Sequence, residues 1–375
     1  MRNETEAHVK EPFIRMTKRA TMPLWKSWLI RIVAVVAALA VSGLLAIILI
    51  DKLKANPGRI GDFYNCFING VFDSTTMVWK FFKGTAILLC ISLAVTPAFR
   101  MRFWNIGAEG QTLMGVLGAT SVAFYLGGKM PEWALLIVML VAALFYGAIW
   151  GIVPAVFKTL SNTNETLFTL MMNYVATFLV SYFLLKWVPS GNALGELPFG
   201  HLSNSNKSED SYIIIIVAVA ILTVVLYFYL NYSKHGYEIS VVGGSENTAR
   251  YIGINVKKVI IRTMLLSGIL CGFAGFLIGS GLNHSITTDA VGGQGFTAIM
   301  VSWLAKFNPI FMLITSGLVI FLQMGAEKIS EVFDVQGAMP EIIVGVILLF
   351  IIGCEFFINY QLHFRKKNAA GGENK

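Results

Sequence analysis

The sequence predicts an all-α integral membrane protein, a polytopic bundle of about ten transmembrane helices. Of the 375 residues, 56% are hydrophobic and only 13% are charged, against about 25% charged in an ordinary soluble protein. Long apolar runs recur along the whole chain, and each is near the length that crosses a bilayer as a helix. The chain is therefore expected to be embedded in a membrane along most of its length.

The expected spans end where apolar sequence gives way to polar residues, often at proline or glycine. Pro97 ends the second span, and Pro154 kinks or ends the fourth. In the seventh, Gly268, Gly272 and Gly275 share one face and predict close helix packing. The spans cover residues 28–50, 84–99, 104–126, 133–157, 167–187, 212–230, 259–282, 292–305, 309–324 and 339–357.

The segments outside the spans set the expected topology. Residues 1–27 form a basic cytoplasmic N-terminus, 28–358 the transmembrane domain, and 359–375 a cytoplasmic tail. Residues 51–83 carry apolar side chains at three- and four-residue steps, typical of an amphipathic helix on the outer surface. Residues 231–258 are polar and cytoplasmic. This arrangement places most of the 29 lysines and arginines inside, which the positive-inside rule favours.

Several function classes lack support in the sequence. The four cysteines are scattered, so we expect neither a disulfide framework nor a metal site. No phosphate-loop motif is present, so ATP hydrolysis would need another chain. No nucleophile and base stand together, and neither a cofactor nor enzymatic activity is expected. The net charge of +8 reflects topology rather than nucleic-acid binding. The first apolar run lacks a cleavage pattern and predicts a span instead of a signal peptide.

A polar motif opens the third expected span. The stretch 104–111 reads Trp-Asn-Ile-Gly-Ala-Glu-Gly-Gln, and Asn105, Glu109 and Gln111 lie at membrane depth. Polar groups there are expensive unless they face protein, water or a ligand, and interrupted helices mark transport pathways. The alternative is a helix cap, with Asn105 accepting from the next turn and Glu109 at the positive helix end. The two interpretations are compatible.

Two of the expected spans begin with similar short sequences. Residues 107–114 and 292–300 each join glycine and glutamine to an apolar helix. They lie five spans apart, so the two copies would be inverted in the membrane. Inverted repeats with interrupted helices at matching positions are typical of transporters, and the sequence therefore predicts an inverted repeat.

The cytoplasmic segment contains a short capped helix. Ser245 is the expected N-cap, Glu246 lies at the positive end, and Gly253 ends the helix. Ala249 and Ile252 would share an apolar face. Such a short helix is marginal alone, so we expect a partner protein to pack against it; the alternative is a solvated loop.

Together these motifs resemble the bacterial ABC-importer permeases of the ribose and branched-chain amino acid group. Among them the chain is most similar to the nucleoside permeases. The resemblance runs from about residue 84 to 355, and is carried by residues 105–111, 163–174, 243–254, 267–275 and 293–299.

The resemblance implies a subunit of the bacterial cell membrane with both termini in the cytoplasm, surrounded by membrane lipids. A separate cytoplasmic ATPase would dock on the coupling helix, an external lipoprotein would deliver substrate, and a second, different permease chain would complete the pore. This chain looks like the longer of such a pair. The expected coupling residues are Gly244, Ser245, Glu246, Asn247, Ala249, Tyr251, Ile252 and Gly253.

Eight polar residues are candidates to line or shape the translocation pathway. Carboxamides match the hydroxyls and base edges of nucleosides, and the alternative role of each residue is capping or hydrogen bonding between helices. The candidates are Asn105, Glu109, Gln111, Asn164, Glu165, Asn173, Asn283 and Gln294.

Three other functions stay open. A permease for simple sugars such as ribose would share the fold. An ion-coupled secondary transporter could use Glu109 as a proton carrier, although it would need no dock for a motor. An integral-membrane enzyme finds no supporting motif.

Overall fold

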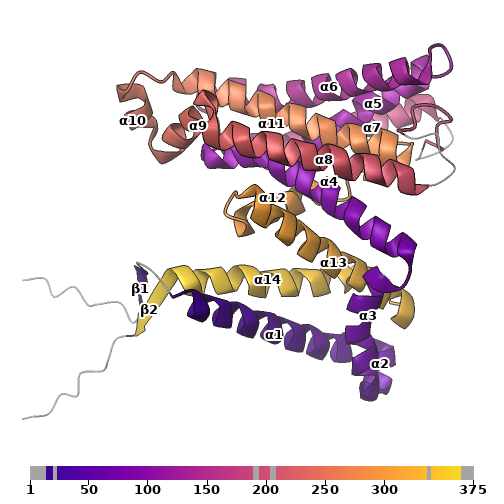
Figure 1. Cartoon of the computed structure of the whole chain (residues 1–375), viewed down its shortest axis with the longest axis vertical. Helices are drawn as coiled ribbons and strands as arrows, with labels where there is room; N and C mark the ends of the chain where they lie inside the picture. The colour runs from indigo at the N-terminus through magenta and orange to yellow at the C-terminus, as the bar shows by residue number, and fades with distance from the viewer. Residues whose placement is uncertain (1–13, 20–22, 189–193, 203–207, 336–338, 365–375) are drawn as a thin grey trace, which may run out of the picture. The chain divides into compact units, whose positions relative to one another are not determined.

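The computed structural model describes residues 14–19, 23–188, 194–202, 208–335 and 339–364, and its regular structure is mostly helical (Figure 1). The elements in chain order are β1 (Ile14–Lys18), α1 (Leu24–Leu49), α2 (Asp51–Ala55), η1 (Pro57–Arg59), α3 (Ile60–Phe72), α4 (Thr75–Arg100), α5 (Ala108–Leu126), α6 (Glu132–Ser161), α7 (Glu165–Trp187), α8 (Ser208–Tyr232), α9 (Lys234–Gly244), α10 (Glu246–Tyr251), α11 (Val256–Ile278), η2 (Gly279–Asn283), α12 (Gln294–Leu304), α13 (Pro309–Phe333), α14 (Met339–Asn359) and β2 (Tyr360–Phe364).

Eight helices in the described part of the chain are long and apolar enough to cross a membrane, which confirms a polytopic helical membrane protein. The expected count of ten is not confirmed, because the spans at 104–126 and 292–305 fall short. Helix α5 has 19 residues but opens with polar ones. Helix α12 has 11 residues and is about 16 Å long, half the thickness of the hydrocarbon core.

Other boundaries differ from the sequence prediction. Helix α4 begins at Thr75, so the end of the 51–83 stretch belongs to this long helix. The Ser74 hydroxyl caps it by accepting from the Met77 amide at 3.3 Å. Helix α13 continues beyond 324 to Phe333. Residues 231–258 contain the whole of α9 in addition to the short α10.

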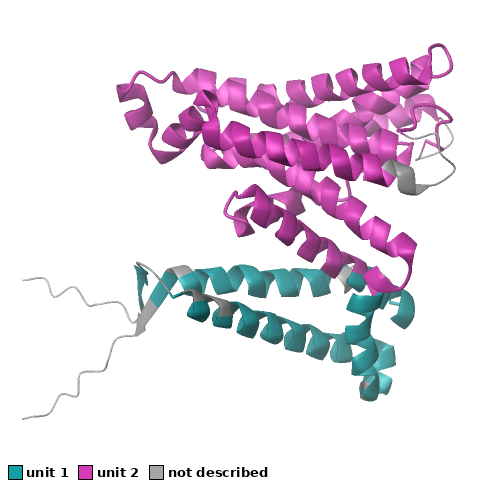
Figure 2. Ribbon diagram, viewed as in Figure 1, with its two compact units in different colours: residues 1–69, 325–375 teal, residues 70–324 magenta. Residues whose placement is uncertain are grey.

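The chain forms two compact units, residues 1–69 with 325–375, and residues 70–324 (Figure 2). In the first unit, the Arg31 guanidinium meets the Glu355 carboxylate at 2.6 Å, which joins α1 to α14. Strands β1 and β2 pair antiparallel, an addition to the all-α prediction. Both strands alternate apolar and polar residues, the pattern of a strand.

The second unit is built around α11, most of whose side chains are buried. Helix α4 runs antiparallel to α11, since Ala98 near the end of α4 shares a buried cluster with Val259 near the start of α11. Helix α5 runs parallel to α11: Gly115 contacts Gly272, and Gly279 lies beside Ala119. These three helices position the site described below.

Glycines bring α11 close to α6 and α5, as the shared face of Gly268, Gly272 and Gly275 predicts. A Cβ on Gly272 would overlap the main chain of Ala143, and one on Gly268 would overlap Gly147. Helix backbones in contact at this distance gain van der Waals packing, which drives association in lipid, where the hydrophobic effect between helices is absent.

We predict that Gly272→Ala lowers the free energy of unfolding by about 1–3 kcal/mol, because the added methyl forces α6 and α11 apart. Denaturant unfolding in mixed micelles measures the loss. Gly345→Ala in α14 is the matched control, since no atom lies within 4 Å of its added Cβ. Equal stability of the two variants would contradict the close-packing account.

Candidate functional site

Helix α5 begins beside the middle of α11. The chain leaves α4 at Arg100 and passes through a non-helical segment, residues 101–107, before α5 starts. The Asn105 amide in this segment donates to the Ser267 hydroxyl at 3.3 Å. Ser267 is the twelfth residue of α11, about 16 Å from its start, and so near the centre of a hydrocarbon core of about 30 Å. The predicted interruption of the third span is therefore real.

Asn105 and Gln111 form a reciprocal amide pair at this point. The Asn105 Nδ2 donates to the Gln111 Oε1 at 3.3 Å, and the Gln111 Nε2 donates to the Asn105 Oδ1 at 3.2 Å. The Asn105 Oδ1 also accepts from the Gly107 amide at 3.0 Å. The two side chains are 0% and 1% exposed, so they shape the site from inside and do not line a surface.

Helix α7 holds the same segment from the other side. The Asn173 Oδ1 accepts from the Gly110 amide at 2.9 Å, and its Nδ2 donates to the Ile106 carbonyl at 2.9 Å. Thr169, one turn earlier, accepts from the Ile106 amide at 3.1 Å. We call Asn105, Glu109, Gln111, Thr169, Asn173 and Ser267 the polar centre. Of these side chains, Asn105, Thr169 and Asn173 pair with main-chain groups at or just before the start of α5.

Glu109 joins the start of α5 to the start of α12. Its two carboxylate oxygens accept from the Gly293 amide at 2.9 Å and the Gly295 amide at 2.7 Å. A negative charge is favourable at a helix N-terminus, and here one carboxylate lies at two of them. A Cβ at Gly295 would collide with the Glu109 main chain, so glycine is required for the contact.

Helices α5 and α12 run in opposite directions from this junction. Helix α12 follows α4, with the Ser302 hydroxyl donating to the Ser92 carbonyl at 2.9 Å. At its far end, Arg100 donates to the Phe307 carbonyl at 3.1 Å. The two segments of the predicted inverted repeat are these two helix starts. Figure 1 shows α12 beside α4 and the antiparallel course of α4 and α11.

Three predicted pathway residues lie apart from the polar centre. Asn164 caps α7, accepting from the Thr166 and Leu167 amides at 3.0 and 3.3 Å. Glu165 forms an ion pair of 2.8 Å with Lys158. Asn283 is exposed, and its amide donates to the Ala290 carbonyl at 3.4 Å. Asn164 thus has the capping role that was the alternative, whereas the Glu165 side chain links α7 to α6.

Gln294 is the first residue of α12, next to the Glu109 contacts. Its Oε1 is buried without a hydrogen-bond partner among the described residues. Sequence reasoning missed Thr169 and Ser267. The four-residue spacing of Thr169 and Asn173, which places both on one face of α7, was the available signal for Thr169. No group of three or more His, Cys, Asp or Glu side chains in the described part could hold a metal ion.

An aromatic cluster adjoins the polar centre. The Trp104 and Trp303 rings stack at 5.4 Å and 23°, and buried Phe99 meets each edge-on at 6.0 and 5.9 Å. The two indoles are 47% and 45% exposed. Trp104 stands on non-helical backbone, which within a membrane is tolerated where it is buried in protein or lines a water-filled cavity. The stacked indole pair is thus an exposed aromatic surface next to the polar centre.

A short helix, α10, is present where the coupling helix is expected. The Ser245 hydroxyl accepts from the Thr248 amide at 3.3 Å, as predicted, and Glu246 pairs with Arg250 at 3.1 Å. Ala249 corrects the expectation of an outward apolar face: it is 0% exposed and packs inside its own unit. Tyr251 is 93% exposed and Ile252 51%. Gly244, Asn247 and Gly253 are also exposed.

The cluster beneath α10 leads to the polar centre. Ala249 and Val242 belong to the same buried group as Met101 and Phe103. Phe103 precedes Asn105 by two residues, on the segment that opens the site. Packed side chains thus run from α10 to the segment that opens the site.

Eight candidate spans in the described part of the chain define a multi-pass membrane protein. A sequence model of the family described as branched-chain amino acid transport system / permease component matches residues 77–352. The chain belongs to this family and is a transport component. The match includes the polar centre and the coupling helix.

Relatives match nearly the whole chain. The guanosine ABC transporter permease protein NupP of Bacillus subtilis is 28% identical, covering 91% of this chain and 97% of that protein. The glucose ABC transporter permease protein TsgB13 of Haloferax volcanii is 28% identical over 93% of each. The nucleoside ABC transporter permease protein NupB of Lactococcus lactis is 26% identical over 74% and 79%. The structure of PsaBC from Streptococcus pneumoniae, in complex with Fab, matches with a TM-score of 0.44 and 13% identity.

We predict that Glu109→Gln lowers the free energy of unfolding by about 1.5–3 kcal/mol, because its amide NH2 can no longer accept from one glycine amide. Denaturant unfolding in mixed micelles measures the change. Asp62→Asn, which loses an exposed ion pair of 3.0 Å with Arg59, is expected to stay within about 1 kcal/mol of wild type. Equal losses in the two variants would contradict a joining role for Glu109.

Proposed function

We propose that this chain is a permease subunit of an ATP-binding cassette importer for nucleosides. The observation that carries the proposal is the family match over residues 77–352, together with the similarity to the guanosine permease protein over 91% of the chain. A sugar is the second candidate substrate, since the glucose permease protein is equally identical, at 28%.

The exposed indole pair supports a nucleoside. Aromatic faces stack on nucleobases with about 1–3 kcal/mol per base, whatever the base. Trp104 and Trp303 are held in place by Phe99 from beneath and leave part of their surface exposed beside the polar centre. A planar base that passes through would stack on the indoles. Because such stacking depends little on which base is bound, it suits an importer of several nucleosides.

The partners follow from the class of transporter. A cytoplasmic ATPase would hydrolyse ATP and contact α10, an external lipoprotein would deliver substrate, and a second permease chain would complete the pore. Both termini would lie in the cytoplasm, because that orientation places most lysines and arginines inside. In this account α10 transmits movement of the ATPase through the packed cluster around Ala249 to the start of α5.

The geometry disfavours the ion-coupled alternative. A proton carrier must exchange its proton with the pathway during each cycle. Both carboxylate oxygens of Glu109 are held by glycine amides at 2.9 and 2.7 Å. Protonation would replace an acceptor with a donor that faces an N–H group, so Glu109 is better suited to joining helices than to carrying protons.

Uptake by cells that lack this chain, with and without the restored gene, tests the function. We expect restored uptake of radiolabelled guanosine that stops when ATP is depleted and survives a proton ionophore. Preferential restoration of glucose or ribose uptake would select the sugar candidate. Uptake that collapses with the ionophore but survives ATP depletion would overturn the ATP-driven proposal.

We predict that Tyr251→Ala lowers ATP-driven uptake about tenfold and weakens co-purification of the ATPase, since an exposed aromatic side chain suits an interface hot spot. Its thermal stability should match wild type. Tyr237→Ala, on α9 and 62% exposed, is the control. Ala249→Glu should instead lower the stability of the chain itself, because a charge would enter its own core. A stable Ala249→Glu variant that loses only the ATPase would contradict this assignment.

We also predict that Trp303→Leu raises the KM for guanosine about tenfold at normal expression, from the loss of base stacking. Trp303→Phe should recover most of the affinity because it retains an aromatic face. Trp133→Leu is the control, since Trp133 is 69% exposed on α6 and outside the cluster. An unchanged KM in Trp303→Leu would remove the stacking role while leaving nucleoside import intact.

A further inference from the structure

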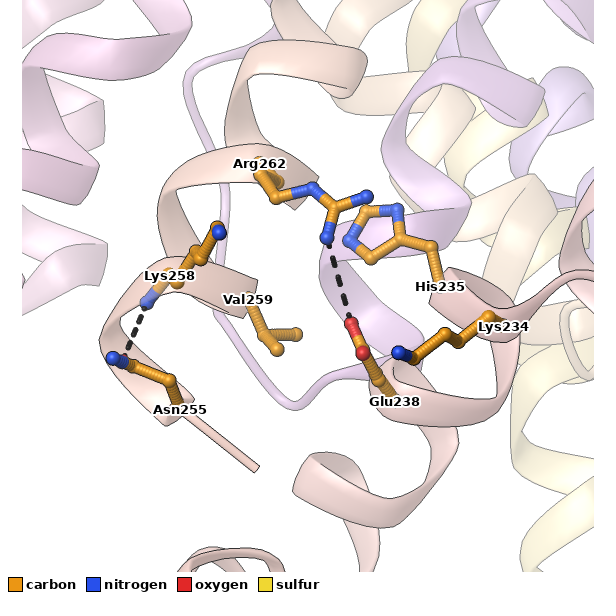
Figure 3. Close-up of a pocket in the computed structure, with 7 residues that line it drawn as sticks. All are labelled: Lys234, His235, Glu238, Asn255, Lys258, Val259 and Arg262. Atoms are coloured by element: carbon orange, nitrogen blue, oxygen red, sulfur yellow. Dashed lines mark hydrogen bonds and ion pairs between the residues drawn. The ribbon is translucent and has the colours of Figure 1, made fainter. Parts of the chain in front are cut away.

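A pocket of about 360 Å³ lies where α9 and α11 begin (Figure 3). It is lined by Lys234, His235, Glu238, Asn255, Lys258, Val259 and Arg262. This volume is at the lower end of the range for small-molecule sites. The polar centre shares none of these side chains. Val259 alone among them also belongs to the buried cluster that contains Ala249 of α10.

The pocket is strongly basic. Lys234 comes from α9, whereas Lys258 and Arg262 lie one turn apart on α11. Glu238 is the single carboxylate among the lining residues, and it meets Arg262 at 3.7 Å. Three cations and one carboxylate leave two positive charges to be balanced. Glu238 offsets only part of the field, and its weak contact leaves the guanidinium able to take a second partner.

His235 contributes no charge to this balance. The Tyr229 hydroxyl lies 2.6 Å from its Nδ1, and the Thr263 hydroxyl lies 3.3 Å from its Nε2. Burial lowers the pKa of the His235 imidazole below its ordinary value, which keeps the ring neutral at neutral pH. The imidazole ring is held on one side of the pocket by these two contacts, and the positive electrostatic field in the pocket comes from the lysines and the arginine.

The start of α11 adds to the positive field. The Asn255 Oδ1 accepts from the Lys258 amide at 3.1 Å and caps the helix. The first-turn amides of α11 carry the positive end of its dipole, and the N-cap Asn255 and the first-turn Lys258 both line the pocket. Neither the cap nor the dipole would define a site alone. Here both occur at a cavity that is also lined by three cationic side chains, and this combination defines the site.

We propose that this pocket binds a phosphate group through Lys234, Lys258 and Arg262. A phosphate monoester or diester supplies the missing negative charge, and guanidinium and ammonium groups are the side chains that bind it in proteins. The pocket adjoins the ends of two candidate spans, Tyr212–Tyr232 and Val256–Asn283, so the group can come from a lipid headgroup or from solution.

Such a ligand would regulate coupling, a consequence that rests on the proposed function. Helices α9 and α11 precede and follow α10 in the chain. A phosphate bound to Lys234 on α9 and to Lys258 on α11 would link the two helices. The position of α10 would then be fixed more firmly against the cluster that leads to the polar centre.

Binding is tested with the purified full-length chain in an uncharged detergent. Sodium phosphate is titrated against sodium chloride at equal ionic strength, and dioctanoyl phosphatidylglycerol against dioctanoyl glycerol, with thermal stability as the readout. We expect saturable stabilisation by phosphatidylglycerol. Stabilisation by phosphate as well assigns the site to the phosphate group itself, and stabilisation by phosphatidylglycerol alone assigns it to the lipid headgroup. Stabilisation by neither overturns the proposal.

Variants separate the pocket from general charge effects. Lys258→Gln and Arg262→Gln should each weaken binding about tenfold, and Lys258→Arg should retain it. Lys257→Gln is the matched control, because Lys257 is the exposed neighbour that does not line the pocket. Glu238→Gln should bind more tightly. Equal weakening by Lys257→Gln overturns the proposal, as does loss of ATPase co-purification in Lys258→Gln with phosphate binding unchanged. These measurements need no transport, so failure of nucleoside uptake would not affect them.

Discussion

The carboxylate of Glu109 holds together a fold that interrupts two membrane segments at the same place. Each interruption leaves main-chain amides unpaired near the centre of the bilayer, where no water satisfies them. Glu109 accepts from Gly293 and Gly295 and stands in the first turn of α5, so one side chain serves both helix starts. Hydrogen bonds to a charged group contribute about 1.5–3 kcal/mol each, which is a large share of the stability of a domain.

The neighbouring amides explain why this arrangement is specific. Asn105, Gln111 and Asn173 each use both ends of the carboxamide, donating with nitrogen and accepting with oxygen. A buried network of this kind is favourable only when complete, because a single unpaired group inside protein is costly. The buried amides of the polar centre thus mainly hold the main chain in place. Under the proposed function, the exposed indoles beside them are the better candidates to contact a substrate.

The buried cluster around Ala249 connects α10 to the polar centre. Phe103 and Met101 belong both to the segment that leads to Asn105 and to the cluster that contains Ala249. Closely packed cores shift between discrete arrangements instead of deforming smoothly. In the proposed function, this cluster is the route by which movement of α10 would reach the start of α5.

Hydropathy predicted most helices of the chain because a membrane demands long apolar runs, and the caps at Ser245 and the face of Gly268 and Gly272 followed from local rules. Other features depend on distant pairing. Ser267 meets Asn105 across 162 positions, and no local signal gives that register. Helix α12 could not be distinguished from a full span because the polar 292–295 segment adjoins an apolar run. The direction of Ala249 was misjudged because a two-residue apolar face does not show which protein covers it.

The side chains of the polar centre find their hydrogen-bond partners within their own chain, which bears on how the protein folds. All partners of Asn105, Gln111, Asn173 and Glu109 described above come from the same polypeptide. Most of these groups can pair as soon as α11 is inserted, and the Glu109 junction closes when α12 follows. The Glu109 carboxylate is then paired within the chain itself, without a group from any other molecule. The polar centre can therefore be completed while a single copy of the chain is being made.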